Sequence, residues 1–264
     1  MIDNLLMVAT VEQLMDYSEK IIEEVEKAIV GKRETLLRLL AAFLSSGGHI
    51  LIEDYPGLAK TLIANSFATA LGLQFKRIQF TPDLLPGDIT GGYIFDNSKN
   101  IFVLRKGPLF TNILLADEIN RASPKTQSAL LEAMQEYQVT LEGATLELPN
   151  PFVVVATQNP IEYEGTFPLP EAQLDRFVIK LHIGYPNPED EREILERRRQ
   201  RKDDAISLNS VVTPQVFSAM RRLVEDVYIH PDVERYIVDL VVMTRHHRQV
   251  VIGFRHMQPA ALVQ

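Results

Sequence analysis

Two spacings of hydrophobic residues alternate along the chain. Up to residue 44, apolar side chains recur every three or four positions, which predicts helices at 10–29 and 32–44. Short apolar runs bounded by turn residues then predict strands at 50–52, 75–80, 112–116, 151–156 and 177–181. Helical patterns separate these runs, so we expect a parallel sheet covered by helices on both faces.

Two further segments predict β-hairpins inserted into this pattern. The first lies near residues 88–106, where apolar runs flank a polar turn at 96–100. The second lies near residues 138–149 and turns at Glu142-Gly143-Ala144. A connection rich in turn residues, 81–88, precedes the first hairpin.

Beyond residue 185 the strand signals stop and only helical patterns follow. Asn187 is placed as an N-cap and Pro188 at the first helical position, and further helices are expected at 213–224 and 232–243. We interpret the basic run at 197–202 as a solvated helix end rather than a nucleic-acid patch. The predicted division is an α/β domain at 1–185 and a small all-helical domain at 186–264, which we expect to be incomplete at its C-terminal end.

Composition narrows the function classes. The 264 residues are 46% hydrophobic, and 27 Lys and Arg against 35 Asp and Glu give a net charge of −8, which argues against nucleic acid as the main partner. The absence of cysteine excludes disulfides and thiol nucleophiles, and the six histidines show no metal-ligand spacing. With no signal peptide and no long apolar run, we expect a cytoplasmic protein without membrane insertion.

The stretch from Ile50 to Leu62 combines a short strand, a Pro-Gly turn and the start of an amphipathic helix that Gly72 closes. This layout is typical of a phosphate-binding loop, in which backbone N–H groups and the positive helix end hold phosphates. Lys60 would reach the β- and γ-phosphates, and the Thr61 hydroxyl would ligate Mg²⁺. The nucleotide-binding residues predicted for the loop are Tyr55, Pro56, Gly57, Leu58, Ala59, Lys60, Thr61 and Leu62.

Two positions depart from the pattern G-x-x-x-x-G-K-[ST]. Asp54 and Ala59 stand where that pattern has glycine. Alanine is a mild change, whereas Asp54 brings a Cβ atom and a negative charge towards a triphosphate. We expect this carboxylate to weaken ATP binding if it faces the phosphates.

The apolar run 112–116 ends in two consecutive acids, Asp117 and Glu118. Such carboxylates are costly to desolvate unless a cation or a proton-transfer task compensates them. A solvated strand end would explain the pair if it stood alone. Because a phosphate loop lies upstream, we expect Asp117 to complete the Mg²⁺ shell and Glu118 to polarise the water that attacks the γ-phosphate.

Two other segments each have two interpretations. Asn159, at the tip of the run 151–156, either orients water against a γ-phosphate or forms an Asx turn before Pro160. The segment Ile29, Val30 and Gly31 is either a helix break, which its local pattern favours, or an apolar seat for a purine.

In combination these residues resemble the MoxR group of AAA+ ATPases, from about residue 29 to the helix after Asn187. The motifs that carry the resemblance are Pro56-Gly57-Leu58-Ala59-Lys60-Thr61, Phe80-Thr81-Pro82-Asp83-Leu84-Leu85-Pro86, Gly107-Pro108-Leu109-Phe110, Leu115-Ala116-Asp117-Glu118-Ile119-Asn120-Arg121-Ala122, Ala156-Thr157-Gln158-Asn159-Pro160 and Glu171-Ala172-Gln173-Leu174-Asp175-Arg176-Phe177.

The resemblance implies a P-loop AAA+ core with a five-stranded parallel sheet, two inserted hairpins and a helical lid. It also implies a homo-oligomeric, hexameric ring with ATP held between neighbours. It identifies Asn159 as the first sensor, Arg176 as the arginine finger given to the adjacent subunit, and Ile29, Val30 and Gly31 as the adenine seat. Arg121 is a weaker candidate for the finger.

The lid signature departs from the family pattern, because Met257 stands where the second-sensor arginine would fall and Arg255 lies two positions earlier. The leading hypothesis is an ATP-hydrolysing ring that remodels or matures a client or adaptor protein, for which the family suggests a von Willebrand factor A domain. A nucleotide-responsive scaffold with little hydrolysis is the alternative that Asp54 and the lid motivate. A nucleic-acid motor is a third, because related rings with similar hairpins act on DNA and Lys99, Arg105 and Lys106 are basic.

Overall fold

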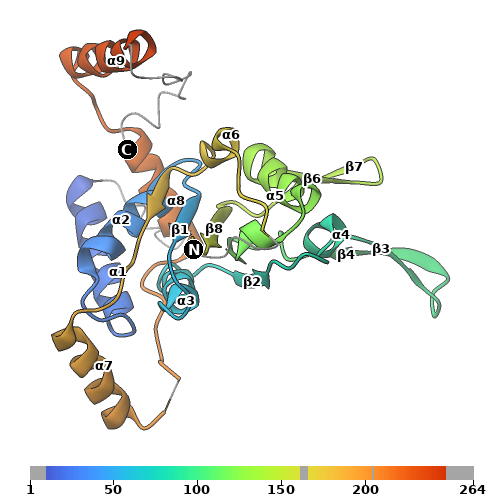
Figure 1. Ribbon diagram of the computed structural model, residues 1–264, viewed down its shortest axis with the longest axis horizontal. Helices are drawn as coiled ribbons and strands as arrows, with labels where there is room; N and C mark the ends of the chain where they lie inside the picture. Colours follow the sequence, from blue (N-terminus) through green and yellow to red (C-terminus); the bar gives the residue numbers. More distant parts are fainter. Residues whose placement is uncertain (1–9, 161–165, 204, 248–264) are drawn as a thin grey trace, which may run out of the picture.

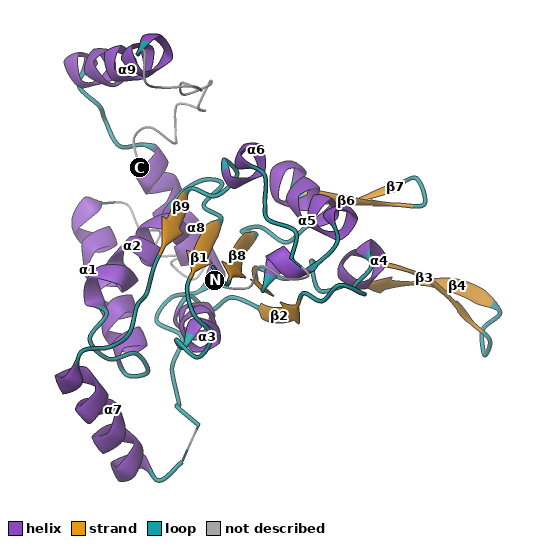
Figure 2. Ribbon diagram, viewed as in Figure 1, coloured by secondary structure: helices purple, strands orange, loops and turns teal. Residues whose placement is uncertain are grey.

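The structure, a computed structural model, describes residues 10–160, 166–203 and 205–247. Its centre is a five-stranded parallel sheet in the order β2-β5-β8-β1-β9 (Figures 1 and 2). The strands are β1 (Ile50–Glu53), β2 (Phe75–Gln79), β5 (Ile113–Asp117), β8 (Val153–Gln158) and β9 (Ile179–Leu181). The predicted five-stranded parallel sheet is confirmed.

Alternation of side chains along the buried strands divides the core into two layers. Ile113 and Leu115 of β5 pack with α1 (Val11–Glu26), α2 (Arg33–Leu44) and α3 (Lys60–Ala70) on one face. Leu114 and Ala116 point to the other face, which α5 (Pro124–Glu136) covers. Both faces are therefore covered by helices, which explains why the central strands read as continuous apolar runs.

Both predicted hairpins form. They are β3 (Gly91–Asp96) with β4 (Ile101–Lys106), and β6 (Gln138–Leu141) with β7 (Ala144–Glu147). Each projects away from the central sheet in Figure 2. The turn-rich connection before the first hairpin also contains a short helix that the sequence pattern did not predict, α4 (Pro86–Thr90). Proline stands at its start, and the Asp88 carboxylate accepts the Leu85 N–H at 2.8 Å, which caps the first turn.

Two local features, one after β5 and one before β9, differ from the elements predicted from the sequence. A 3-10 turn, η1 (Ile119–Arg121), follows β5 directly. Strand β9 begins at Ile179 rather than at residue 177, because the amides of Arg176 and Phe177 donate to carbonyls of the last two residues of α6 (Glu171–Leu174).

The C-terminal region is helical, with α7 (Pro188–Arg201), α8 (Pro214–Glu225) and α9 (Pro231–His246). Phe217 and Met220 of α8 are buried in the same cluster as α1, α2 and α3, and the Val211 N–H donates to the Ala70 carbonyl at 2.8 Å. Helix α8 therefore shares the main core, and the division at residue 185 stays a prediction. Among the described residues, no helix is both long and apolar enough to cross a membrane.

Candidate functional site

The carboxyl ends of β1, β5 and β8 meet at one edge of the sheet. Glu53 pairs in register with Gln158, and Ala116 pairs with Ala156. The loop after β1, the acids that end β5 and the residues that end β8 are therefore brought together. In parallel sheets this edge is where ligands bind.

The loop after β1 contains two residues with left-handed backbone. Gly57 and Ala59 have φ values of +85° and +53°, in the left-handed region. Tyr55, Pro56, Gly57, Leu58 and Ala59 form the loop, and Lys60, Thr61 and Leu62 begin α3. The loop thus ends at the positive end of a helix, as expected for an anion site.

The Lys60 side chain lies between the loop and the acids of β5. Its Nζ atom donates to the Asp54 carbonyl oxygen. Burial lowers the pKa of Lys60, while the nearby charges of Asp54, Asp117 and Glu118 act in the opposite direction. Lys60 is therefore a cation close enough to interact with both candidate catalytic acids.

The expected effect of Asp54 on ATP binding depended on the direction of its carboxylate, and the structure shows that direction. Its side chain is only 4% exposed. Atom Oδ1 accepts the Tyr55 N–H at 2.9 Å, and Oδ2 accepts the N–H groups of Ile183 and Gly184, each at 2.7 Å. The carboxylate is thus directed at the segment after β9 and is satisfied there by backbone donors.

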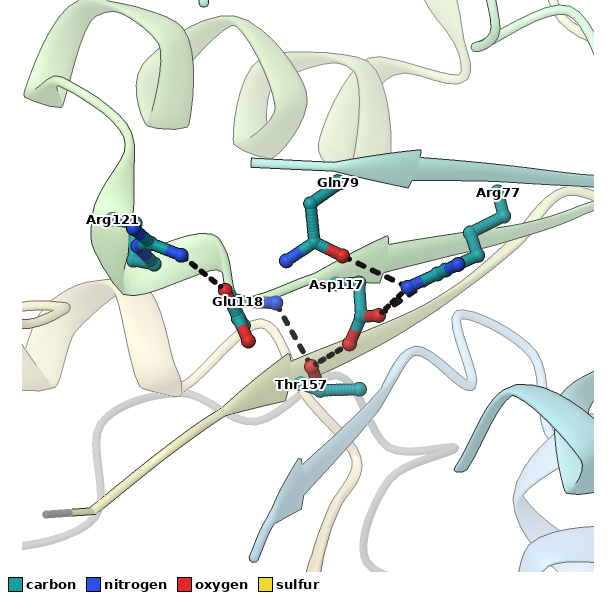
Figure 3. A network of polar contacts seen from close by, with 6 residues as sticks. All are labelled: Arg77, Gln79, Asp117, Glu118, Arg121 and Thr157. Atoms are coloured by element: carbon teal, nitrogen blue, oxygen red, sulfur yellow. Dashed lines mark hydrogen bonds and ion pairs between the residues drawn. The ribbon is translucent and has the colours of Figure 1, made fainter. Parts of the chain in front are cut away.

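Asp117 is the centre of a polar network (Figure 3). Its Oδ1 accepts the Thr157 hydroxyl at 2.6 Å, and its Oδ2 accepts Arg77 Nη2 at 2.6 Å and Nε at 3.2 Å. The Thr157 oxygen in turn accepts the Glu118 N–H at 2.9 Å, and Gln79 Oε1 accepts a third bond from Arg77, through Nη2, at 2.9 Å. The network fixes the orientation of the carboxylate assigned to Mg²⁺.

Arg77 and Thr157 are functional candidates that sequence reasoning missed. Arg77 carried a weak signal, because it is a charged residue within an otherwise strand-like run. Thr157 belongs to a quoted motif, but nothing in its local sequence points to Asp117. The pairing of β2 and β8 on either side of β5 brings these side chains to the acid.

Glu118 has left-handed backbone, with φ +55°, and its Oε2 accepts Arg121 Nη1 at 2.9 Å. A non-glycine residue in this region is strained, and such strain is commonest at functional sites. Arg121, considered as an arginine finger, is in this structure the ion-pair partner of the glutamate in its own chain (Figure 3).

The two remaining catalytic candidates, Asn159 and Arg176, both follow the residues of this network in the sequence. Asn159 directly follows β8 and is 9% exposed, so its amide is buried at the carboxyl edge. Arg176 precedes β9, and its Nη2 donates to Gln135 Oε1 of α5 at 2.8 Å. Its role toward a neighbouring subunit stays a prediction.

The predicted purine seat is a buried turn between α1 and α2. Ile29 and Val30 are buried, and Gly31 has φ +71°. The first turn of α7 lies directly against it, because a Cβ atom added at Gly31 would fall 2.0 Å from Asp190 Oδ2. The structure therefore shows the helix break at this turn, and the role of the turn as a purine seat stays a prediction.

The oxygen donors of Thr61 and Asp117 suit a metal ion such as Mg²⁺. Within the described ranges, no group of three or more His, Asp or Glu side chains could hold a metal by itself. Thr61 and Asp117 supply a hydroxyl and an oriented carboxylate, which suits an ion that takes its other ligands from phosphate and water, as Mg²⁺ does. The second-sensor positions, Arg255 and Met257, lie outside the described residues.

The chain is similar in sequence to several known proteins. Residues 49–179 match the ATPase family associated with various cellular activities (AAA). The chain is 47% identical over 254 residues to YeaC of Bacillus subtilis (strain 168), which covers 96% of this chain and 78% of that protein. It is 45% identical over 232 residues to the chaperone MoxR1 of Mycobacterium tuberculosis, covering 88% of this chain.

The chain belongs to the MoxR family of AAA+ ATPases. The crystal structure of a candidate ATPase from Cytophaga hutchinsonii superposes with a TM-score of 0.79 at 46% identity, over 89% of this MoxR-family chain and 71% of that one. The family match extends from the start of β1 into β9 and thus includes the loop, both acids, Asn159 and Arg176. This MoxR-family chain spans 60% of the length of MoxR1.

Proposed function

We propose that this chain binds ATP with Mg²⁺ and hydrolyses it at the carboxyl edge of the sheet. The observation that carries the proposal is the position of Lys60. A half-buried cation, at the start of a helix and next to Asp117 and Glu118, is placed to balance phosphate charge beside candidate metal and water sites. Membership of the MoxR family supports the same activity.

Each side chain has a proposed task. Lys60 and the loop N–H groups hold the β- and γ-phosphates, and Thr61 and Asp117 hold the metal. When bound, Mg²⁺ would offset charge on the phosphate oxygens. Glu118 accepts a proton from the attacking water and Asn159 orients that water, since both end neighbouring strands.

We further propose that the chain works as a homo-oligomeric ring that remodels a client protein. The support is its similarity to a protein named a chaperone, at 45% identity. A hexameric ring, an arginine finger from Arg176 and a partner with a von Willebrand factor A domain remain predictions. Asp54 no longer favours the alternative of a scaffold with little hydrolysis, because three backbone N–H groups compensate its charge.

Two substitutions test the activity. Lys60→Ala removes the positive side chain of the loop, so ATP binding measured by calorimetry should be abolished. Glu118→Gln removes the proton acceptor but keeps the shape, so ATP should still bind while phosphate release stops. Lys99→Ala, in the turn of the first hairpin, is the matched control and should change neither quantity. Unaltered ATP affinity in Lys60→Ala would mean that the nucleotide binds elsewhere.

A further inference from the structure

Asp54 holds a segment that is 129 residues away in the sequence. We call residues 182–187, between β9 and α7, the connector. Oδ2 of Asp54 receives two successive N–H groups of the connector, from Ile183 and Gly184, each at 2.7 Å. Gly184 has φ +66°, a left-handed conformation that helps successive N–H groups converge on one anion.

The position of Asp54 requires these bonds. A carboxylate that is only 4% exposed would be strongly destabilising without donors. Three backbone N–H groups, including that of Tyr55, compensate its charge. Conversely, removing the carboxylate would leave two connector N–H groups without their acceptor, one of them buried.

Two further contacts fasten the connector to the same part of the molecule. The Lys32 Nζ atom, at the start of α2, donates to the carbonyl oxygens of Ile183 and Tyr185, each at 2.9 Å. The Tyr185 ring stacks on Tyr55 of the loop, with centroids 6.2 Å apart and an interplanar angle of 24°. The connector is therefore held by the phosphate loop on one side and by Lys32 on the other.

The connector leads into α7, whose first turn lies against the predicted purine seat. Its last residue, Asn187, caps α7 by accepting the Asp190 N–H at 2.8 Å. The Asp190 carboxylate lies against Gly31, and Arg197 Nη1 donates to the Glu26 carbonyl at 2.7 Å. Hydrogen bonds and contacts thus link Asp54, the connector, the first turn of α7 and the seat in series.

From this series we infer that Asp54 is a positioning residue for the nucleotide base. This inference rests on the proposed ATP site and on the predicted purine seat at residues 29–31, and adds to them a residue that acts through the connector. The Asp54 carboxylate accepts two of its three hydrogen bonds from the connector, whereas Lys60 is hydrogen-bonded to the Asp54 carbonyl and senses the carboxylate only through its charge. We therefore assign the positioning effect of the side chain to the predicted base seat. Its loss should weaken binding of a ligand with a base and spare a ligand of phosphates alone.

The experiment compares Mg·ATP with Mg·tripolyphosphate by calorimetry on the full chain. Asp54→Gly should lower ATP affinity by about tenfold or more, the effect of losing charge-assisted hydrogen bonds. Tripolyphosphate affinity should stay within about twofold, and Asp54→Asn, which keeps an acceptor oxygen, should recover part of the ATP affinity. Asp96→Gly is the control, because it removes an equivalent aspartate that accepts two Ser98 bonds on the exposed hairpin.

Lys32→Gln removes the contacts on the other side of the connector and tests the same inference independently. It should also lower the affinity for ATP and leave the affinity for tripolyphosphate nearly unchanged. ATP affinity unchanged or tighter in Asp54→Gly would overturn the inference, whatever the result for Lys32→Gln. Equal losses of ATP and tripolyphosphate would also overturn it, because they would place the effect on the phosphate loop. The two proposals can fail separately. If Lys60→Ala still binds ATP, the proposed ATP site is wrong. If Lys60→Ala loses ATP binding but Asp54→Gly keeps the wild-type ATP affinity, only the role of Asp54 is wrong.

Discussion

Nη2 of Arg77 lies 2.6 Å from Oδ2 of Asp117, so an arginine of β2 holds the carboxylate assigned to Mg²⁺. The other oxygen of Asp117 is held separately by the Thr157 hydroxyl. A cation that approaches Asp117 therefore meets a carboxylate that is already oriented and also partly neutralised. The guanidinium is about half exposed, so its effect on an incoming ion is modest.

Replacing Arg77 with methionine should lower the Mg²⁺ concentration required for half-maximal ATP binding. Removing a positive charge beside Asp117 reduces repulsion of the metal, while Thr157 keeps the carboxylate oriented. We expect a change of about two- to fivefold, the range for partly exposed ion pairs. Mg²⁺ titrations measure it, with Arg38→Met, an exposed arginine paired within α2, as the control. A higher Mg²⁺ requirement would instead make Arg77 part of the metal site.

Arg121→Ala should lower turnover by about tenfold while leaving ATP affinity nearly unchanged. The reason is that Arg121 holds the Glu118 carboxylate through a 2.9 Å contact, so its loss frees the proton acceptor to rotate. Steady-state phosphate release and calorimetry separate the two effects. Wild-type turnover in this variant would show that Glu118 is oriented by its own strained backbone.

Arg176 should act on the nucleotide of the adjacent subunit. Arg176→Ala and Glu118→Gln are each expected to be inactive alone, since arginine fingers contribute about 10³ to 10⁵ in rate. Mixed in one ring, they should regain activity at interfaces where an intact Arg176 meets an intact Glu118. Mixed rings that form but stay inactive would rule out a shared site.

The same mixing assay places Arg121. The observed partner of Arg121 is the Glu118 of its own chain. In a mixture of Arg121→Ala and Glu118→Gln, every chain lacks one of these two groups. No activity beyond that of the separate variants should return. Recovery in this mixture would make Arg121 the finger instead.

His49 should make stability depend on pH between about 4 and 6.5. It is 2% exposed, and burial, aided by the nearby Arg221 charge, lowers its pKa to about 4, although a bond to the Met134 carbonyl acts in the opposite direction. Unfolded histidine titrates near 6.5. The neutral ring therefore contributes fully above that value, and this contribution, about 3 kcal/mol, is lost as the pH falls towards 4.

Urea unfolding at pH 7.5 and pH 5 measures this dependence. His49→Gln, which cannot titrate, should lose less stability on acidification than the wild type. His230→Gln changes an exposed histidine and should behave like the wild type. Identical losses in the wild type and His49→Gln would assign the acid sensitivity to other groups.

The sequence determined the elements and the chemistry they carry. Strands β5 and β8 were predictable because a strand buried on both faces must be apolar throughout. Lys60, Asp117, Glu118 and Asn159 were predictable as candidates because each follows such a strand or the loop after it, and parallel strands end at one edge. These are local signals, contained in a few consecutive residues.

Only the tertiary structure decided how these residues are held. Arg77 reaches Asp117 because β2 pairs with β5 in a register that no local pattern specifies. In the sequence, Asp54 stands only as a departure from the glycine pattern of a phosphate loop. The N–H groups that donate to its carboxylate belong to Ile183 and Gly184, which are far away in the sequence. Hydrogen bonds between distant segments depend on how elements pack and not on periodicity, so a buried carboxylate can be interpreted only when its donors are in place.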